Sequence, residues 1–249
     1  MPIIIKSDDE IAIIREAGRV VAQVLEILKE EIRPGLVTKE LDAIVRREFA
    51  ARGVTPTFLD YHGYPATVCV SVNDQIVHGI PGERVLQEGD IVSIDLGATH
   101  KGFVGDAAIT VGVGRTSAKA ERLLRVTEEA LWKGIAAARA GAPLGAISFA
   151  IQRHGESAGF SVVREYVGHG VGREMHEEPQ VPNYGPPDRG PVLLKGMVLA
   201  LEPMVNVGDW RTRRDSDNWT VSTLDGSLSA HFEHTIAITG GEAQVLTLP

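Results

Sequence analysis

Two carboxylates occupy matching positions in two similar stretches of the sequence. Residues 89–95 (Gly-Asp-Ile-Val-Ser-Ile-Asp) and 196–202 (Gly-Met-Val-Leu-Ala-Leu-Glu) each begin with a glycine and reach an acid six residues later. Asp95 and Glu202 therefore stand 107 residues apart, which is 202 minus 95. The apolar residues before each acid are typical of a buried strand, so we expect both acids at strand ends. A carboxylate buried there without a partner is costly, and each acid therefore predicts a nearby cation.

Each half of the chain offers a second acid in a later strand-like segment. Asp106 lies in Gly-Phe-Val-Gly-Asp-Ala-Ala-Ile-Thr-Val, and Glu233 lies in His-Phe-Glu-His-Thr-Ile-Ala-Ile-Thr. If two related halves face each other across a pseudo-twofold axis, the four acids form one cluster, which cannot stay ionised without positive charge between its members. His169, between Gly168 and Gly170, is a fifth candidate ligand because glycines let backbone and metal approach closely.

Four carboxylates and one imidazole make an oxygen-rich donor set that suits two divalent ions bridged by carboxylates. Hard oxygen ligands favour manganese, iron(II) or cobalt over a purely zinc site. Two such ions about 3.5–4 Å apart can hold a hydroxide at neutral pH and polarise a carbonyl group beside it. The residue types therefore predict a hydrolase.

Each of these residues also has a simpler interpretation. Taken singly, Asp95 or Asp106 is more often a solvated turn residue than a ligand, and His169 between glycines can be a loop residue. Glu202 is a stronger candidate because it follows the apolar residues 198–201. The sequence contains no H-E-x-x-H motif, so no local metalloprotease signature supports the site. The symmetric placement of the acids is what favours a metal centre.

The elements that must hold these side chains repeat once along the chain. Ser7 and Glu10 fit a capping box that starts a helix, and Pro34 and Gly35 stop it. Helical spacing of apolar residues predicts three more helices, at 38–52, 117–140 and 144–158. Alternation predicts strands at 68–72 and 91–96 and throughout much of the chain after residue 162. The order of two helices followed by strands thus occurs twice, which indicates an internal duplication.

Length and composition limit the class of protein. At 249 residues the chain is long enough for one catalytic domain over 1–249, with halves at roughly 1–115 and 116–249. The 25 basic and 33 acidic residues give a net charge of -8, which disfavours specific binding to nucleic acid. Cys69 is the only cysteine, so an intrachain disulfide framework and a cysteine-rich zinc site are excluded. The mean hydropathy of +0.00 excludes a chain of membrane spans, and the first ten residues lack the apolar core of a signal peptide. We expect a cytoplasmic protein without membrane contact.

Seven short segments together resemble one known family. They are Tyr-His-Gly-Tyr-Pro at 61–65, Val-His-Gly-Ile-Pro at 77–81, Asp-Ile-Val-Ser-Ile-Asp at 90–95, Gly-His-Gly-Val-Gly at 168–172, His-Glu-Glu-Pro at 176–179, Leu-Glu-Pro-Met at 201–204 and Ser-Ala-His-Phe-Glu-His-Thr at 229–235. In this order they resemble type I methionine aminopeptidase. The resemblance implies the α+β "pita-bread" (creatinase/aminopeptidase) fold, in which two pseudo-symmetric halves place helices outside a curved antiparallel sheet. It also implies removal of the initiator methionine from new polypeptides whose second residue is small.

The resemblance also assigns roles to individual residues. His78 would contact the nitrogen of the scissile bond, His176 would bind its carbonyl oxygen, and Glu202 would act as both ligand and general base. Cobalt, manganese, iron(II), zinc and nickel are all candidate metals. The two divalent ions would be held by Asp95, Asp106, His169, Glu202 and Glu233, with Asp106 and Glu233 bridging. The methionine pocket would be lined by Tyr61, Tyr64, Cys69, Met175 and Trp219, and His78 and His176 would also contact substrate.

Several positions depart from the family pattern. Phe58 replaces a cysteine and Met175 replaces a phenylalanine, which leaves the shape of the pocket open but keeps its apolar bulk. Ala107 stands where a hydroxyl is usual beside the metal site. Backbone carbonyls near Asn73 and Ser229 would bind a monovalent cation. No zinc-binding or ribosome-docking extension is expected, and we expect a monomer that contacts the ribosome only transiently.

Other functions of the same fold remain open at this point. Proline-specific peptidases carry an extra N-terminal domain and type II methionine aminopeptidases a helical insertion, and 249 residues leave no room for either. A non-catalytic binding module with this fold would have lost metal ligands, whereas this chain keeps all five. A broader dinuclear-metal aminopeptidase is the alternative closest to the main prediction.

Overall fold

Two pairs of helices, one in each half of the chain, form as the sequence predicts. A computed structural model describes residues 2–249. The first helix, α1 (Asp8–Glu31), is capped by Ser7, whose side chain accepts the Glu10 amide while Glu10 reaches back to the Ser7 amide. The other helices are α2 (Thr38–Arg52), α3 (Ala118–Ala137) and α4 (Gly145–Ser157). The bounds of α2 match the prediction, and the other three helices lie within three residues of their predicted bounds.

The strands build one nine-stranded sheet in which every pairing is antiparallel. Its main path runs β1, β4, β5, β14, β9, β7, β8, and β2 and β15 pair with β4 and β14. The bounds of these strands are β1 Thr55–Pro56, β2 Cys69–Val72, β4 Ile91–His100, β5 Phe103–Gly112, β7 Gly168–Gly170, β8 Glu177–Val181, β9 Val198–Leu201, β14 Glu233–Ala237 and β15 Gln244–Val245.

Two smaller sheets complete the rim. One contains β6 (Ser161–Val162), β10 (Met204–Asn206) and β13 (Ser229–His231), and the other contains β3 (Gln75–Val77), β11 (Thr212–Arg214) and β12 (Val221–Thr223). The second of these joins a strand of the first half to a hairpin of the second half.

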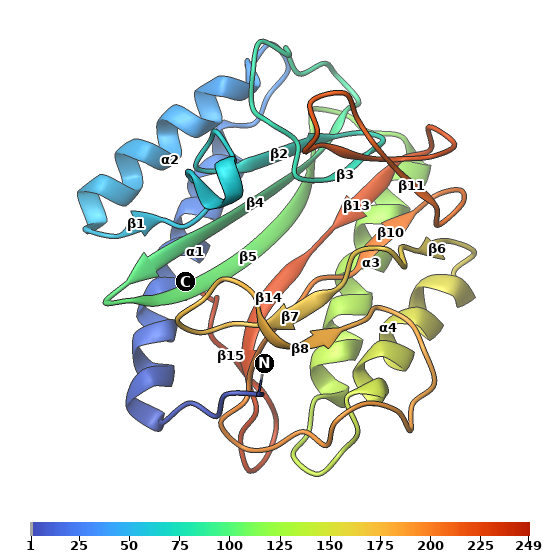
Figure 1. The fold of residues 1–249 in the computed structure, drawn as a ribbon. Helices are drawn as coiled ribbons and strands as arrows, with labels where there is room; N and C mark the ends of the chain where they lie inside the picture. The colour runs from blue at the N-terminus through green and yellow to red at the C-terminus, as the bar shows by residue number, and fades with distance from the viewer. Residues whose placement is uncertain (1) are drawn as a thin grey trace.

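The two halves meet where β5 pairs with β14 in the middle of the main sheet. The helix α1 packs on β4 and β5, and α3 packs on β5, β9 and β14, so both lie behind the sheet (Figure 1). Their buried faces and the sheet enclose two apolar clusters, one in each half. The predicted α+β fold, with helices outside an antiparallel sheet, is thereby confirmed.

One strand prediction is wrong in its extent. The sequence predicts that the strand from Ile91 ends near Leu96 with Asp95 at its end, but β4 continues to His100. Pairing with β5 continues to His100 and Phe103, and the chain turns only at Lys101 and Gly102, which both have positive φ. Asp95 therefore lies in the middle of a strand, whereas Glu202 follows directly after β9, as predicted.

No described helix combines the length and apolar character that crossing a bilayer requires.

Candidate metal centre and substrate cavity

The register of the sheet places all five candidate ligands on one face. Ala108 pairs with Asp95 on one side and with Glu233 on the other. Residues paired directly across antiparallel strands project to the same side, and so do alternate residues of one strand, which adds Asp106. On the next strand Ala200 pairs with His169 and with Thr235, which is two residues beyond Glu233.

Glu202 is two residues beyond Ala200 and reaches the same face. His169 lies in β7 and not in a loop, which removes the simpler interpretation of that residue. The side chains of all five line one cavity of about 420 Å³. The acids that the sequence predicts as two distant pairs are therefore neighbours in space.

Several of these side chains lie within reach of a common ion. Asp106, His169 and Glu233 each offer one ligand atom within 4.8 Å of the others. The Nε2 atom of His169 lies 3.8 Å from Asp106 Oδ2 and 3.5 Å from Glu202 Oε1. The buried atoms Asp95 Oδ1, Asp106 Oδ1 and Glu233 Oε1 have no hydrogen-bond partner within residues 2–249. Buried polar atoms without partners are rare in folded proteins, so the donor set fits a divalent metal.

Burial and mutual repulsion set the charge of the cluster. Burial, followed by the neighbouring Asp106, raises the pKa of Asp95 well above its usual value, and the same causes raise the pKa of Glu233. Burial and then the charges of Asp95 and Asp106 raise the pKa of Glu202. The pKa of Asp106 rises to about 7, chiefly through burial. Without a cation, burial and repulsion favour the protonated form of these acids, and a bound cation would displace the protons.

His169 is prepared to act as a neutral ligand. Burial lowers its pKa to about 3, so the ring is uncharged at neutral pH. Its Nδ1 donates to the carbonyl oxygen of Gly170 at 2.9 Å. The hydrogen bond assigns the single proton to Nδ1 and leaves the Nε2 lone pair facing the acids.

The two predicted substrate histidines line the same cavity. The His176 ring lies 4.3 Å from the His169 ring, and its Nδ1 is 2.7 Å from the Tyr61 hydroxyl. His78 has a positive φ of 61° and packs edge-on against Tyr166 at 5.9 Å. Burial lowers the pKa of His78 to about 4 and also lowers the pKa of His176. Both rings are therefore neutral at pH 7.

The cavity continues into an apolar end. Tyr64 packs edge-on against Trp219 at 5.1 Å, and its hydroxyl donates to the carbonyls of Val68 and Gly79. Phe58 and Met175 are both buried, so the two departures from the family pattern retain apolar walls. The walls of this end are formed by Phe58, Tyr61, Tyr64, Cys69, Met175 and Trp219.

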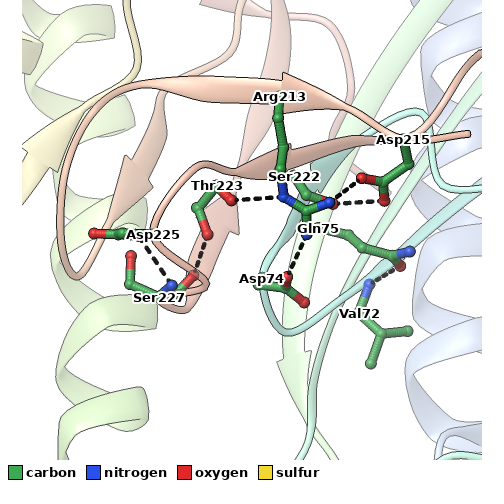
Figure 2. Close-up of polar contacts among 9 residues, drawn as sticks. All are labelled: Val72, Asp74, Gln75, Arg213, Asp215, Ser222, Thr223, Asp225 and Ser227. Atoms are coloured by element: carbon green, nitrogen blue, oxygen red, sulfur yellow. Dashed lines mark hydrogen bonds and ion pairs between the residues drawn. The ribbon is translucent and has the colours of Figure 1, made fainter.

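A hydrogen-bonded network ties the hairpin that carries Trp219 to the opposite half (Figure 2). Arg213 of β11 contacts Asp74 at 3.3 Å and Asp215 at 2.6 Å, and its Nε donates to the Thr223 carbonyl. Asp74 belongs to the turn between β2 and β3 in the first half. Trp219 is therefore held against a wall of the pocket that the other half supplies.

A buried ion pair holds the segment before β8. Lys6 and Glu177 are both less than a tenth exposed and form an ion pair. The Glu177 carboxylate also accepts the backbone amides of Arg173 and Glu174. The contacts of Glu177 and Lys6 thus fix the short segment that carries Met175 and His176.

Two further histidines, His62 and His231, lie near the predicted site. His62, with φ 50°, also lines the cavity. His231 is buried, its ring nitrogens have no hydrogen-bond partner within residues 2–249, and Nε2 lies 3.8 Å from Glu202 Oε2. Sequence reasoning missed both, although each stands inside one of the family segments.

Asn73 and Ser229, the residues of the predicted monovalent-cation site, are adjacent: the Asn73 carbonyl accepts the Ser229 amide.

Removing and restoring metal should change stability measurably. Because no Lys or Arg side chain among residues 2–249 forms an ion pair with these buried acids, we expect added Co²⁺ or Mn²⁺ to raise the melting temperature of chelator-treated protein. At 100 times the dissociation constant, binding contributes about 2.7 kcal/mol, which corresponds to about 5–10 °C for a chain of this length. Differential scanning calorimetry measures the shift. Asp106→Asn serves as the control, and an equal shift in that variant would contradict the assigned site.

Comparison with known proteins gives consistent matches over the whole chain. The model of metallopeptidase family M24 matches residues 12–240. A Bacillus subtilis protein named methionine aminopeptidase 1 is 55% identical over 98% of this chain and 99% of its own length. A methionine aminopeptidase of Clostridium perfringens is 51% identical over 99% of both chains.

Solved structures give the same result. The crystal structure of methionine aminopeptidase from Thermotoga maritima is 49% identical, covers 100% of both chains and superposes with a TM-score of 0.98. A prolidase from Pyrococcus furiosus is 25% identical with a TM-score of 0.81, and the alignment covers 99% of this chain but 66% of the prolidase. The prolidase thus has a sizeable further region outside the shared fold.

Proposed function

The chain belongs to metallopeptidase family M24, and we infer that it is a methionine aminopeptidase, which removes the initiator methionine from new polypeptides. Its fold is the pita-bread fold of the methionine aminopeptidases and prolidases with which it superposes. The observation that carries this conclusion is a single cavity whose polar end holds five candidate ligands and whose other end is apolar. Such a cavity can place a peptide carbonyl beside metal while it encloses one apolar side chain.

We propose that Asp95, Asp106, His169, Glu202 and Glu233 would hold two divalent ions, with Asp106 and Glu233 shared between them. Cobalt, manganese, iron(II), zinc and nickel all suit carboxylate and imidazole donors. When bound, such ions polarise a carbonyl group and lower the pKa of water. Support comes from the unpartnered carboxylate oxygens and from the free Nε2 of His169.

The side chains of the cavity would carry out the remaining steps of the reaction. Glu202 would accept the proton of the attacking water as general base. His176 would donate from its ring to the carbonyl oxygen as negative charge develops there, and His78 would contact the nitrogen of the scissile bond. The methionine side chain would lie against Tyr61, Tyr64, Cys69, Met175 and Trp219, which form an apolar, adaptable wall.

Further proposals concern the setting of the reaction. We propose one catalytic domain over 1–249 with halves at roughly 1–115 and 116–249, since both halves contribute strands to one sheet. We propose that the enzyme works as a monomer, because the five candidate ligands and the apolar wall all belong to one chain. Because the proposed substrate is the N-terminus of a growing polypeptide, we propose a cytoplasmic enzyme with transient ribosome contact. A monovalent cation at the Asn73 and Ser229 carbonyls would stabilise the join between β2 and β13.

Selectivity at the first two substrate residues tests the proposed function. Metal-reconstituted protein should cleave Met-Ala-Ser faster than Leu-Ala-Ser by roughly 10–200-fold, the margin that an apolar pocket allows. At the second position Met-Gly, Met-Ala, Met-Ser and Met-Pro should exceed Met-Leu and Met-Lys by about 10²-fold, because a bulky side chain beside His78 displaces the carbonyl. Values of kcat/KM for a peptide panel measure both ratios.

The same panel distinguishes the alternatives. Cleavage of Leu-Ala-Ser as fast as Met-Ala-Ser, or tolerance of bulky second residues, would instead identify a broader dinuclear-metal aminopeptidase. No hydrolysis by protein with full metal content would identify a non-catalytic binding module. Norleucine is the informative extra substrate, because Phe58 and Met175 change the pocket wall.

A further inference from the structure

The hydroxyl of Tyr61 contacts the imidazole of His176, in addition to the role of the Tyr61 ring as a wall of the pocket. Tyr61 begins the short helical turn η1 (Tyr61–Gly63), 115 residues before His176. Its hydroxyl lies 2.7 Å from Nδ1 of His176, with the two ring centroids 5.5 Å apart. Among residues 2–249 neither the Tyr61 hydroxyl nor the His176 ring makes another hydrogen bond. The phenol and the imidazole therefore form an isolated pair at the edge of the cavity.

We propose that Tyr61 is a positioning residue for His176: its hydroxyl donates to Nδ1 and so keeps the proton of the ring on Nε2, the nitrogen left free for the carbonyl oxygen of the substrate. This inference rests on the proposed function, which assigns His176 to that oxygen. A neutral imidazole carries one N–H, and the nitrogen that carries it is decided by the partner of the other. If Nδ1 held the proton, Nε2 would present a lone pair to the developing negative charge and would repel it.

Protonation favours the phenol as the donor. Burial raises the pKa of the Tyr61 phenol, so the phenol keeps its proton, and a neutral imidazole has a lone pair on one ring nitrogen that can accept it. If His176 Nδ1 instead donated to the Tyr61 oxygen, the phenol proton would have no acceptor among the described residues. When Tyr61 donates, its proton has an acceptor and the unprotonated nitrogen of His176 has a donor.

The backbone around His176 does not depend on Tyr61. The segment is held by Glu177, through the amides of Arg173 and Glu174 and the buried Lys6. Tyr61→Phe keeps the aromatic ring in the methionine pocket and removes only the hydroxyl. The variant should therefore change the proton and the orientation of one imidazole and leave the fold intact.

A double-mutant cycle tests this role. With Met-Ala-Ser and metal-reconstituted enzyme, Tyr61→Phe should lower kcat about 3–10-fold, which is the value of one neutral hydrogen bond, and leave KM unchanged. In the His176→Ala background the same change should have no effect, because the partner is absent. Tyr64→Phe removes a phenol hydroxyl of the same pocket that bonds Val68 and Gly79 instead, so its effect should be equal in both backgrounds.

A spectroscopic measurement reports the tautomer directly. In Zn²⁺-loaded protein with ¹⁵N-labelled histidine, NMR should show the His176 proton on Nε2 in the wild type and a mixture of tautomers in Tyr61→Phe. His176→Ala identifies the signals. Equal kinetic losses in both backgrounds, a rise in KM alone, or a tautomer unchanged by Tyr61→Phe would each overturn the proposal. Failure of the proposed function would be recognised separately, because wild-type protein would then not cleave Met-Ala-Ser.

Discussion

Asp106→Asn is expected to lower the hydrolysis of Met-Ala-Ser by about 10³-fold or more, and Glu233→Gln should do the same. Both acids lie on the two strands that join the halves, and both have a buried oxygen with no partner among residues 2–249. Replacing either carboxylate by an amide would remove one negative charge from the proposed site for two divalent ions, and the activation of water at neutral pH would depend on those ions. Initial rates after chelation and reconstitution, together with metal content by mass spectrometry, give the result.

The folded state should tolerate these changes. Burial raises the pKa of Asp106 to about 7, so the metal-free site already contains protonated acid, and an amide relieves repulsion. We therefore expect metal-free Asp106→Asn to melt no lower than metal-free wild type. Asp188→Asn, at an exposed acid in a loop away from the cavity, is the matched control and should keep wild-type activity. Full activity of Asp106→Asn after reconstitution would remove it from the ligand set.

His176→Ala should lower kcat by about 10²–10³-fold and leave metal content unchanged. The reason is that one donor to a developing oxyanion is worth this much when it acts in a site closed to water. His176 lines the cavity beside His169, with its ring 4.3 Å from the ligand ring. Steady-state kinetics and metal analysis of the same preparation separate a loss of catalysis from a loss of metal.

The metal content of His176→Ala decides between two roles for His176. Loss of metal in proportion to activity would make it a ligand, and an unchanged kcat would remove it from the reaction. His154→Ala is the matched control, because His154 is a surface residue paired with Glu129 on the helical side of the molecule. That variant should retain the wild-type kcat and metal content.

Local patterns in the sequence predict most of the framework and the composition of the site. The capping box of Ser7 and Glu10 and the turn at Gly53, where φ is 66°, set helix ends through neighbours only a few residues away. Alternation places Asp95 and Asp106 on strands, and the quoted motifs single out His78 and His176 among eight histidines. Each of these signals depends on contacts that are close along the chain, so the sequence displays them directly.

The end of β4 shows where local patterns stop. Leu96 is the last residue of the apolar run, yet the strand continues because β5 pairs with it as far as His100. Hydrogen bonds between strands decide this extent, and the sequence of one strand does not contain its partner. The position of Asp95 in the middle of the strand follows from that pairing.

The sequence alone therefore determined the fold class, the helices and most of the chemical groups that meet in the site. The tertiary structure decided how those groups meet: Asp95 and Glu233 flank the same Ala108, His169 directs Nε2 at the acids, and Tyr61 reaches His176 across 115 residues. It also brought His62 to the cavity and His231 to Glu202, and it joined Lys6 to Glu177. The physical reason is that hydrogen-bond direction, tautomer and desolvation depend on atoms a few ångströms away in space, and only the packed sheet brings those atoms together.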